Sequence, residues 1–238
     1  MRVFAGPNGS GKTTIIKSLQ NIIPFGVYIN ADDIELQLKE SKILLFNTYQ
    51  LNVTENEIQH FFKKSTFSPV KRSDDDLWTK IRVEKNILKI NTSVDSYLAA
   101  DIAEFIRQQL LANGMSFTYE TVMSHESKIH FFKQAKKQGY RVYLYFIATE
   151  DPEINISRVN VRVAQNGHPV LPQTVRDIYY KSLNQVREAI KHSDDAYFWD
   201  NSGSASLLIA DIKESSIVTI VDLEKVPNWF EKYVANSI

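Results

Sequence analysis

The chain has 238 residues, 43% of them hydrophobic and 24% charged, which is typical of a globular protein with a substantial core. Lys plus Arg and Asp plus Glu both number 28, so no overall positive field would draw the chain to nucleic acid or to an anionic membrane. There is no cysteine, which excludes disulfides and cysteine-based metal sites, and we find no signal peptide and no apolar run long enough to span a bilayer. We therefore expect a soluble, cytoplasmic protein with a single domain over residues 1–238.

The first predicted element is a short strand, Val3-Phe4-Ala5, and a phosphate-binding pattern follows it directly. Residues Gly6-Pro7-Asn8-Gly9-Ser10-Gly11-Lys12-Thr13 match G-x-x-x-x-G-K-[ST] at every position, and a helix is predicted from Thr13 to Ile23. In such a loop backbone N–H groups turn towards a phosphate, the lysine adds a positive charge, and the hydroxyl after it is placed to coordinate Mg²⁺. We predict that this loop, with Thr14, binds a nucleoside triphosphate and that Thr13 is the metal ligand.

Strands and helices alternate along most of the remaining chain. We predict strands at 27–29, 117–122, 142–147 and 196–199, and helices at 99–111, 125–138, 152–165 and 172–192. This alternation favours a three-layer α/β/α fold with a mostly parallel central sheet, and ligands then bind at the carboxyl ends of the strands.

Two regions depart from the alternation. Residues 207–222 are predicted to form two strands of an antiparallel edge hairpin, followed by a short helix near Trp229. Residues 41–92 fit the scheme poorly: they contain a capping box, Thr54 to Glu57, and a strand-like alternation of Ile81 and Val83. We interpret 41–92 as an insertion that follows the second strand and packs beside it.

Five motifs occur in an order that resembles the zeta-toxin family of P-loop kinases. The motifs are Ala5 to Thr14, Tyr28 to Ile34, Ser116 to Ser124, Arg158 to His168 and Asp200 to Gly203. The resemblance covers residues 1–35 and 93–235 and leaves out the insertion. It implies a P-loop kinase-like fold, a lid at residues 152–172, and ATP with Mg²⁺ as the phosphate donor.

The resemblance also implies a catalytic base. Asp32 ends the motif of the second strand, where the family aspartate takes the proton of the acceptor hydroxyl, and Asn30 is expected to contact the acceptor. Aspartate is also a common helix cap, so either Asp32 or Asp33 could instead cap a helix that starts at Ile34. We expect Asp32 to act in catalysis and Asp33 to be the cap.

Further site residues are expected at the ends of later strands. Glu120 and Thr121 end the strand at 117–122, and the resemblance makes Glu120 an acceptor-binding or metal-shell residue with Thr121 beside it in the acceptor site. The alternative for Glu120 is a salt bridge to an arginine of the lid. Asn201 lies in a turn sequence, Asp200 to Gly203, that is expected beneath the adenine base.

Arg158 and Arg162 are four residues apart on one predicted helix, so their guanidinium groups share a face. Directed at the cleft, they would stabilise the charge of the transferred phosphoryl group; the alternative is an ordinary solvated basic face. The chain departs from the family pattern in the next helix, where Asp177 precedes Tyr179 in place of an arginine pair and only Arg176 lies nearby.

These features predict an ATP- and Mg²⁺-dependent kinase that phosphorylates a hydroxyl of a small metabolite. The family resemblance implies a nucleotide sugar such as UDP-N-acetylglucosamine as the acceptor, and a small antitoxin protein as a partner. Two alternatives stay open: a kinase that acts on nucleotides or on polynucleotide ends, and a nucleotide-binding interaction module without catalysis.

Overall fold

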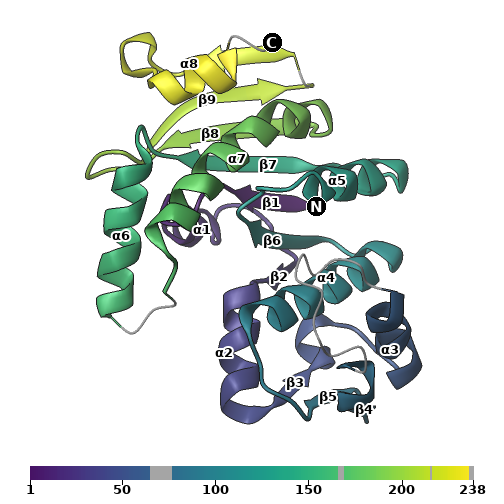
Figure 1. The fold of residues 1–238 in the computed structure, drawn as a ribbon. Helices are drawn as coiled ribbons and strands as arrows, with labels where there is room; N and C mark the ends of the chain where they lie inside the picture. Colours follow the sequence, from purple (N-terminus) through teal and green to yellow (C-terminus); the bar gives the residue numbers. More distant parts are fainter. Residues whose placement is uncertain (65–76, 166–168, 215, 236–238) are drawn as a thin grey trace. The chain divides into compact units, whose positions relative to one another are not determined.

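The computed structural model describes residues 1–64, 77–165, 169–214 and 216–235. The chain forms two compact units, one made of residues 1–25 and 118–238 and the other of residues 26–117 (Figure 1). Parts of the predicted insertion (65–76) and of the predicted lid (166–168) lie outside the described residues. Each unit is described by itself below.

The first unit contains six of the seven strands of a large, mostly parallel sheet. These strands are β1 (Arg2–Ala5), β6 (Phe117–Thr121), β7 (Tyr143–Ala148), β8 (Asp195–Asp200), β9 (Leu207–Lys213) and β10 (Ile217–Ile220), in the order β10-β9-β8-β7-β1-β6. Strand β1 pairs in parallel with β6 and β7, and β7 pairs in parallel with β8. Strands β9 and β10 are antiparallel, which confirms the predicted C-terminal edge hairpin.

Helices cover this sheet. They are α1 (Lys12–Leu19), α5 (Ser127–Lys137), α6 (Pro152–Ala164), α7 (Pro172–Lys191) and α8 (Asn228–Tyr233), with a short 3₁₀ turn, η3, at Leu223–Lys225. Helices α5, α7 and α8 lie on one side of the sheet and α1 on the other, as the predicted three-layer fold requires (Figure 1). The ring of Phe146 in β7 lies 6.0 Å from that of Trp229, and the ring of Phe198 in β8 lies 5.4 Å from that of Phe230, so aromatic contacts join α8 to the sheet.

The first helix is shorter than its sequence pattern predicts. Helix α1 ends at Leu19, four residues before the expected end at Ile23, and Ile22 is 74% exposed. Pro24 disfavours the helical conformation at Ile23, so the helix could not have reached the expected end. None of the helices in the described ranges is long and apolar enough to cross a membrane.

The second unit contains β2 and a small antiparallel sheet of its own. Its elements are β2 (Val27–Ile29), α2 (Ala31–Ser41), β3 (Ile43–Leu45), η1 (Phe46–Tyr49), α3 (Glu55–Lys64), η2 (Leu77–Lys80), β4 (Ile81–Glu84), β5 (Ile87–Ile90) and α4 (Ser96–Ala112). The small sheet has the order β3-β5-β4 and lies within the range predicted as an insertion. The predicted capping box is confirmed, because the Glu57 carboxylate accepts from the Thr54 N–H at 2.7 Å and the Glu57 N–H donates to the Thr54 hydroxyl.

A partly buried asparagine at a turn links the parts of this unit. Asn86, at the turn between β4 and β5, has a left-handed backbone with φ of 64°. Its amide nitrogen donates to the Leu51 carbonyl at 2.7 Å and to Asn47, and its amide oxygen accepts from the Val53 N–H at 2.8 Å. One side chain therefore satisfies backbone groups on a segment more than 30 residues away, which fixes the turn against the rest of the unit.

Candidate functional site

The loop between β1 and α1 has the backbone of a phosphate cradle. Gly6 and Gly11 have φ of 142° and 91°, values that residues with a side chain rarely adopt. A Cβ added to Gly6 would lie 2.0 Å from the Ile147 carbonyl oxygen, and one added to Gly11 would lie 2.0 Å from the side-chain nitrogen of Asn201. Glycine is therefore favoured at both positions by backbone conformation, and also by close contact with the backbone of β7 at Gly6 and with the Asn201 side chain at Gly11.

Two asparagines from distant parts of the chain hold the loop in place. Asn155 of α6 is fully buried; its amide nitrogen donates to the Asn8 carbonyl at 2.6 Å, and its amide oxygen accepts from the Thr149 hydroxyl. The Asn201 amide nitrogen donates to the Ser10 carbonyl at 2.8 Å, and its oxygen accepts from the Ser206 hydroxyl at 2.7 Å. Asn201 thus reaches the predicted nucleotide site, and Asn155 is a supporting residue that the sequence analysis missed.

A sequence signal for Asn155 does exist. It is buried on the same side of α6 as Ile156 and Val159, and a single amide on an otherwise apolar helix stripe needs a buried partner. The structure shows that this partner is the phosphate loop.

The polar groups of the loop fit an anionic ligand. The Lys12 ammonium lies 2.8 Å from the Gly6 carbonyl oxygen and 3.0 Å from that of Pro7, so its charge is held at the loop. The Ser10 hydroxyl and the Asn8 side-chain oxygen are buried, and neither has a hydrogen-bond partner among the described residues. The N-terminus of α1 has no side-chain cap, so no side chain competes with a phosphate for its positive dipole end.

Thr13 and Thr14 lie in the first turn of α1 and are both exposed. The Thr13 hydroxyl therefore fits the predicted role of a ligand to the Mg²⁺ that accompanies a nucleoside triphosphate. Mg²⁺ supplies charge neutralisation to a bound triphosphate in such sites.

A cavity of about 560 Å³ adjoins the loop on the side of the Asp200–Gly203 turn. Its walls come from Gly11 and Thr14, from Trp199 at the end of β8, and from residues 203–206. Arg158 of α6 also lines it, and the guanidinium donates to the carbonyl of Asn201 at 2.7 Å. The cavity has the aromatic and polar lining that suits a nucleoside base.

This placement bears on the arginine prediction. Arg158 also lies 3.3 Å from the Gly203 carbonyl oxygen, so in this structure it braces the turn at the cavity. Arg162 is half-buried one helical turn further along α6. The Arg176 guanidinium of α7 donates to the Glu153 carboxylate at 2.9 Å, which ties α7 to the start of α6. The role of Arg158 and Arg162 at a γ-phosphate stays a prediction.

The predicted lid has a small apolar core of its own. Ile156 and Val159 of α6 pack with Val175 of α7, and Val170 packs against them. Helix α6 is therefore packed against the start of α7, and its N-terminal part is tied to the phosphate loop by Asn155.

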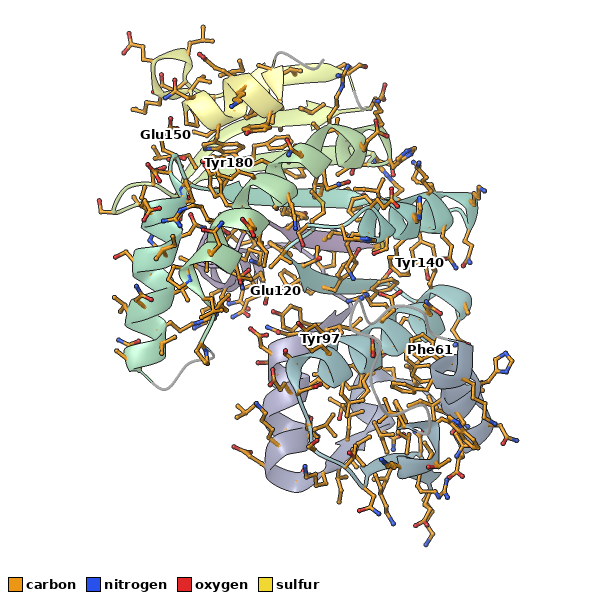
Figure 2. All side chains as sticks on the ribbon, in the orientation of Figure 1. Phe61, Tyr97, Glu120, Tyr140, Glu150 and Tyr180 are labelled. Carbon is orange, nitrogen blue, oxygen red and sulfur yellow. The ribbon has the colours of Figure 1, made fainter. Side chains whose placement is uncertain are left out.

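Strand β6 places its last residues beside the phosphate loop. Thr121 pairs with Ala5 in register, and its carbonyl accepts from the Gly6 N–H at 3.2 Å. The Thr121 hydroxyl accepts from the Met123 N–H at 3.0 Å, and Met123 is fully buried with φ of 48°. Glu120, partly buried and one residue earlier, is thus set at the carboxyl end of β6 by a strained turn (Figure 2).

The second unit carries the predicted base. Helix α2 begins at Ala31, and its N-cap is Asn30, whose side-chain oxygen accepts from the Asp32 N–H at 2.8 Å. The expectation that Asp33 caps a helix starting at Ile34 is therefore wrong, because Asn30 takes that role three residues earlier. The Asp32 side chain is exposed and is not the cap of this helix.

Asp33 and Tyr49 form an electrostatically linked pair in this unit. Burial, followed by the charge of Asp32, raises the pKa of Asp33 above its ordinary value. Burial, followed by the charge of Asp33, raises the pKa of Tyr49 to about 12, so the Tyr49 phenol stays neutral at physiological pH. Tyr49 lies in the predicted insertion and was not expected near the acidic pair.

Comparison with known proteins identifies the family. The model of the family described as zeta toxin matches residues 89–211, which is more than half of the chain. This chain belongs to the zeta toxin family. An uncharacterized protein of Haemophilus influenzae is 34% identical to it over 65 residues, which are 27% of this chain and 46% of that protein.

Solved structures share the fold of this zeta toxin family member. A chain of AvrRxo1-ORF1:AvrRxo1-ORF2 solved with sulphate ions matches with a TM-score of 0.56 and 14% identity, over 98% of this chain and 62% of that one. A structure of AvrRxo1-ORF1:-ORF2 with ATP matches with a TM-score of 0.54 and 15% identity over the same shares of the two chains. This chain therefore spans less than two thirds of the proteins it matches. The predicted P-loop kinase-like fold, mostly parallel with an antiparallel C-terminal edge, is confirmed.

Proposed function

We propose that this zeta toxin family member is a kinase that transfers the γ-phosphoryl group of ATP, with Mg²⁺, to a hydroxyl of a small metabolite. The observation that carries the proposal is the phosphate loop itself. Its glycines, its lysine at the Gly6 carbonyl and its uncapped helix form an anion site braced by two distant asparagines. The family match adds weight, and the structural neighbour solved with ATP is a fold-level parallel.

In this proposal the first unit binds the donor. The loop from Gly6 to Thr14 holds the phosphates, Thr13 holds Mg²⁺, and the cavity beside Asn201 takes the adenine base. Lys12 and the arginines of α6 stabilise the negative charge that develops on the transferred phosphoryl group. Phosphoryl transfer is mainly a matter of position and charge, which are the features that this loop provides.

Carboxylate and amide side chains bind and activate the acceptor in this proposal. Asp32 takes the proton of the acceptor hydroxyl, whose oxygen then forms the new bond to the γ-phosphorus while ADP leaves. Asp32 is suited to the role because Asn30, and not Asp32, caps α2. Glu120 and Thr121 bind the acceptor in the same proposal, together with the amide nitrogen of Asn30, which lies 3.4 Å from the Tyr28 hydroxyl.

The family suggests what the acceptor and the partner are. We propose a nucleotide sugar, with UDP-N-acetylglucosamine as the first compound to test, and a small antitoxin protein that neutralises the activity by covering the nucleotide site. Both rest on the family match. The named structural neighbours contain two open reading frame products, which is a parallel for a partner protein.

The test is a transfer assay with γ-labelled ATP and Mg²⁺ over three groups of acceptors: nucleotide sugars, free nucleotides, and oligonucleotides with a 5′ hydroxyl. We expect label in a nucleotide sugar. Label in the second or third group would instead support the nucleotide or polynucleotide-end kinase. If ATP binds with no transfer to any acceptor, the chain is an interaction module and the proposal is wrong.

A further inference from the structure

The turn at Asp200–Gly203 is held by a carboxylate that lies outside the lining of the cavity beside it. The Asp200 carboxylate accepts three hydrogen bonds, from the Trp229 indole N–H at 2.9 Å, from the Ser202 hydroxyl at 2.8 Å and from the Ser202 N–H at 3.1 Å. The cavity is lined by Asn201 and by residues 203–206, but not by Asp200, Ser202 or Trp229. These three residues therefore act on the turn and not on the space that would receive a base.

The same hydrogen bonds connect the turn to two other segments of the first unit. Trp229 is a buried residue of α8, and the Ser202 hydroxyl accepts from the Glu150 N–H, in the loop after β7, at 2.7 Å. The Glu150 carboxylate accepts from the Asn228 side chain at the start of α8, and Figure 2 shows Glu150 at the same end of the unit as that helix. The C-terminal helix and the loop after β7 are therefore both bonded to the turn.

Helix α8 is a firm support for this network. The Trp229 ring lies 6.0 Å from the Phe146 ring of β7, and the fully buried Phe230 ring lies 5.4 Å from the Phe198 ring of β8. Packing of large buried rings contributes more free energy than a single hydrogen bond. The sheet therefore sets the position of the indole N–H, and the hydrogen bond to Asp200 holds the turn to that position.

The part of the turn that depends on this support is the wall of the cavity. Asn201 is anchored independently, because its N–H donates to the Ala148 carbonyl and its side chain donates to the Ser10 carbonyl, both at 2.8 Å. Ser202 follows directly, and its N–H and its hydroxyl both bond to the carboxylate. Loss of these bonds should therefore displace the wall formed by residues 203–206, while the phosphate loop keeps its contact with Asn201.

We propose that Asp200, Ser202 and Trp229 are positioning residues for the nucleoside part of the donor, and that α8 acts through them to hold the turn in the conformation that receives a base. The proposal rests on the proposed function, because it takes the cavity beside Asn201 as the nucleoside site. Groups that hold a binding wall in place raise affinity without touching the ligand. The expected effect is on the base and not on the phosphates, since the phosphates are assigned to the separate loop from Gly6 to Thr14.

The test compares ATP with inorganic tripolyphosphate, which has the phosphates but no nucleoside, by titration calorimetry of each with Mg²⁺. The unaltered chain should bind ATP more tightly than tripolyphosphate. Asp200→Ala should weaken ATP binding about tenfold, the scale of one hydrogen bond, and leave tripolyphosphate binding unchanged. The loss is partial because Arg158 still bonds to the Gly203 carbonyl. Asp200→Asn keeps an acceptor for Trp229 and should weaken ATP binding less.

Two further variants leave the charge of the chain unchanged, and they carry the test if Asp200→Ala does not fold. Trp229→Phe removes the indole N–H and keeps an aromatic ring, and Ser202→Ala removes the hydroxyl that joins Asp200 to the loop after β7. Both should weaken ATP binding by about three- to tenfold and spare tripolyphosphate. Phe230→Leu is the matched control, because it disturbs the packing of α8 on the sheet without removing a hydrogen bond to the turn. It should lower stability and leave the ratio of the two dissociation constants unchanged.

Several outcomes would overturn the proposal. Unchanged ATP affinity in Trp229→Phe and Ser202→Ala would do so, and so would an equal loss of ATP and tripolyphosphate affinity, which indicates a general role in stability. Equal affinity of the unaltered chain for the two ligands would show that the cavity receives no base. The kinase activity is judged separately by label transfer: an ATP preference that the variants lose, in a chain that labels no acceptor, would support this inference and refute the kinase.

Discussion

The two units hold their candidate site residues in different ways. In the first unit the phosphate loop is braced from far along the chain, since Asn155 and Asn201 are 147 and 191 residues away from the carbonyls that they bind. In the second unit Asp32 is placed by a helix cap only two residues away. The proposed donor site therefore depends on the tertiary structure of its unit, whereas the position of the proposed base on its helix depends on local structure. Substitutions should break the two arrangements differently.

The largest effect is expected at the charge in the loop. Lys12→Met should reduce phosphoryl transfer by roughly 10²–10³-fold, because a fixed cation no longer offsets the charge on the transferred group. Transfer rates with saturating ATP measure this effect. Lys17→Met changes an exposed lysine in the last turn of the same helix and should leave the rate unchanged. A similar loss in both variants would argue for a general effect of helix charge.

The next largest effect tests the close contact between Gly11 of the loop and the Asn201 side chain. Gly11→Ala must accept a left-handed backbone and displace the Asn201 amide, and we expect the free energy of unfolding to fall by about 3 kcal/mol. Gly139→Ala is a matched control, because Gly139 has φ of 81° and nothing within 4 Å of an added Cβ. It should cost only about 1 kcal/mol. Equal values from denaturant titration would show that the contact with Asn201 adds nothing.

A smaller effect tests the hydrogen bonds by which Asn155 holds the loop. Asn155→Ala removes the donor to the Asn8 carbonyl and one of the two acceptors near the Thr149 hydroxyl, which should lower the unfolding free energy by about 2 kcal/mol and weaken ATP binding. Asn160→Ala, at an exposed position of the same helix, should change stability by less than about 0.5 kcal/mol. Titration calorimetry with ATP and thermal unfolding measure both quantities. Intact ATP affinity in Asn155→Ala would mean that the loop holds its shape alone.

The smallest effect is expected in the second unit. Asn30→Ala removes the cap of α2 and should lower the unfolding free energy by about 1 kcal/mol, while Asn30→Asp keeps an acceptor and should cost less. ATP affinity should not change in either variant. Loss of ATP binding in Asn30→Ala would contradict the division between a donor site in one unit and a local cap in the other.

The same contrast explains what the sequence could predict. The capping box at Thr54 and most strands follow from residue patterns within a few positions, and the structure confirms them. The phosphate loop also follows from a local pattern, and its role stays a prediction. The cap of α2 is also local, yet the assignment to Asp33 was wrong, because three neighbouring polar residues can all cap and only the true start of the helix selects Asn30.

Other features depend on contacts that no short pattern records. In the sequence, Asn155 is simply one polar residue of an amphipathic helix. Only the fold shows that its side chain binds the phosphate loop. The small sheet of the second unit joins β3 and β5 across more than 40 residues, so short alternating runs could not reveal their pairing. The place of Arg158 over the Asp200–Gly203 turn likewise depends on where α6 packs, which its spacing from Arg162 does not determine.

The central claim is that Asp32 takes the acceptor proton in a phosphoryl transfer from ATP held by the first unit. The most direct test is the initial rate of label transfer from γ-labelled ATP, with Mg²⁺, to the acceptor found in the panel, for the unaltered chain and for Asp32→Asn. Because Asn30 rather than the Asp32 carboxylate caps α2, this variant should keep its stability and its ATP affinity. We predict a rate at least about 10²-fold lower in Asp32→Asn, as expected for loss of a general base; equal rates in the two proteins would contradict the account.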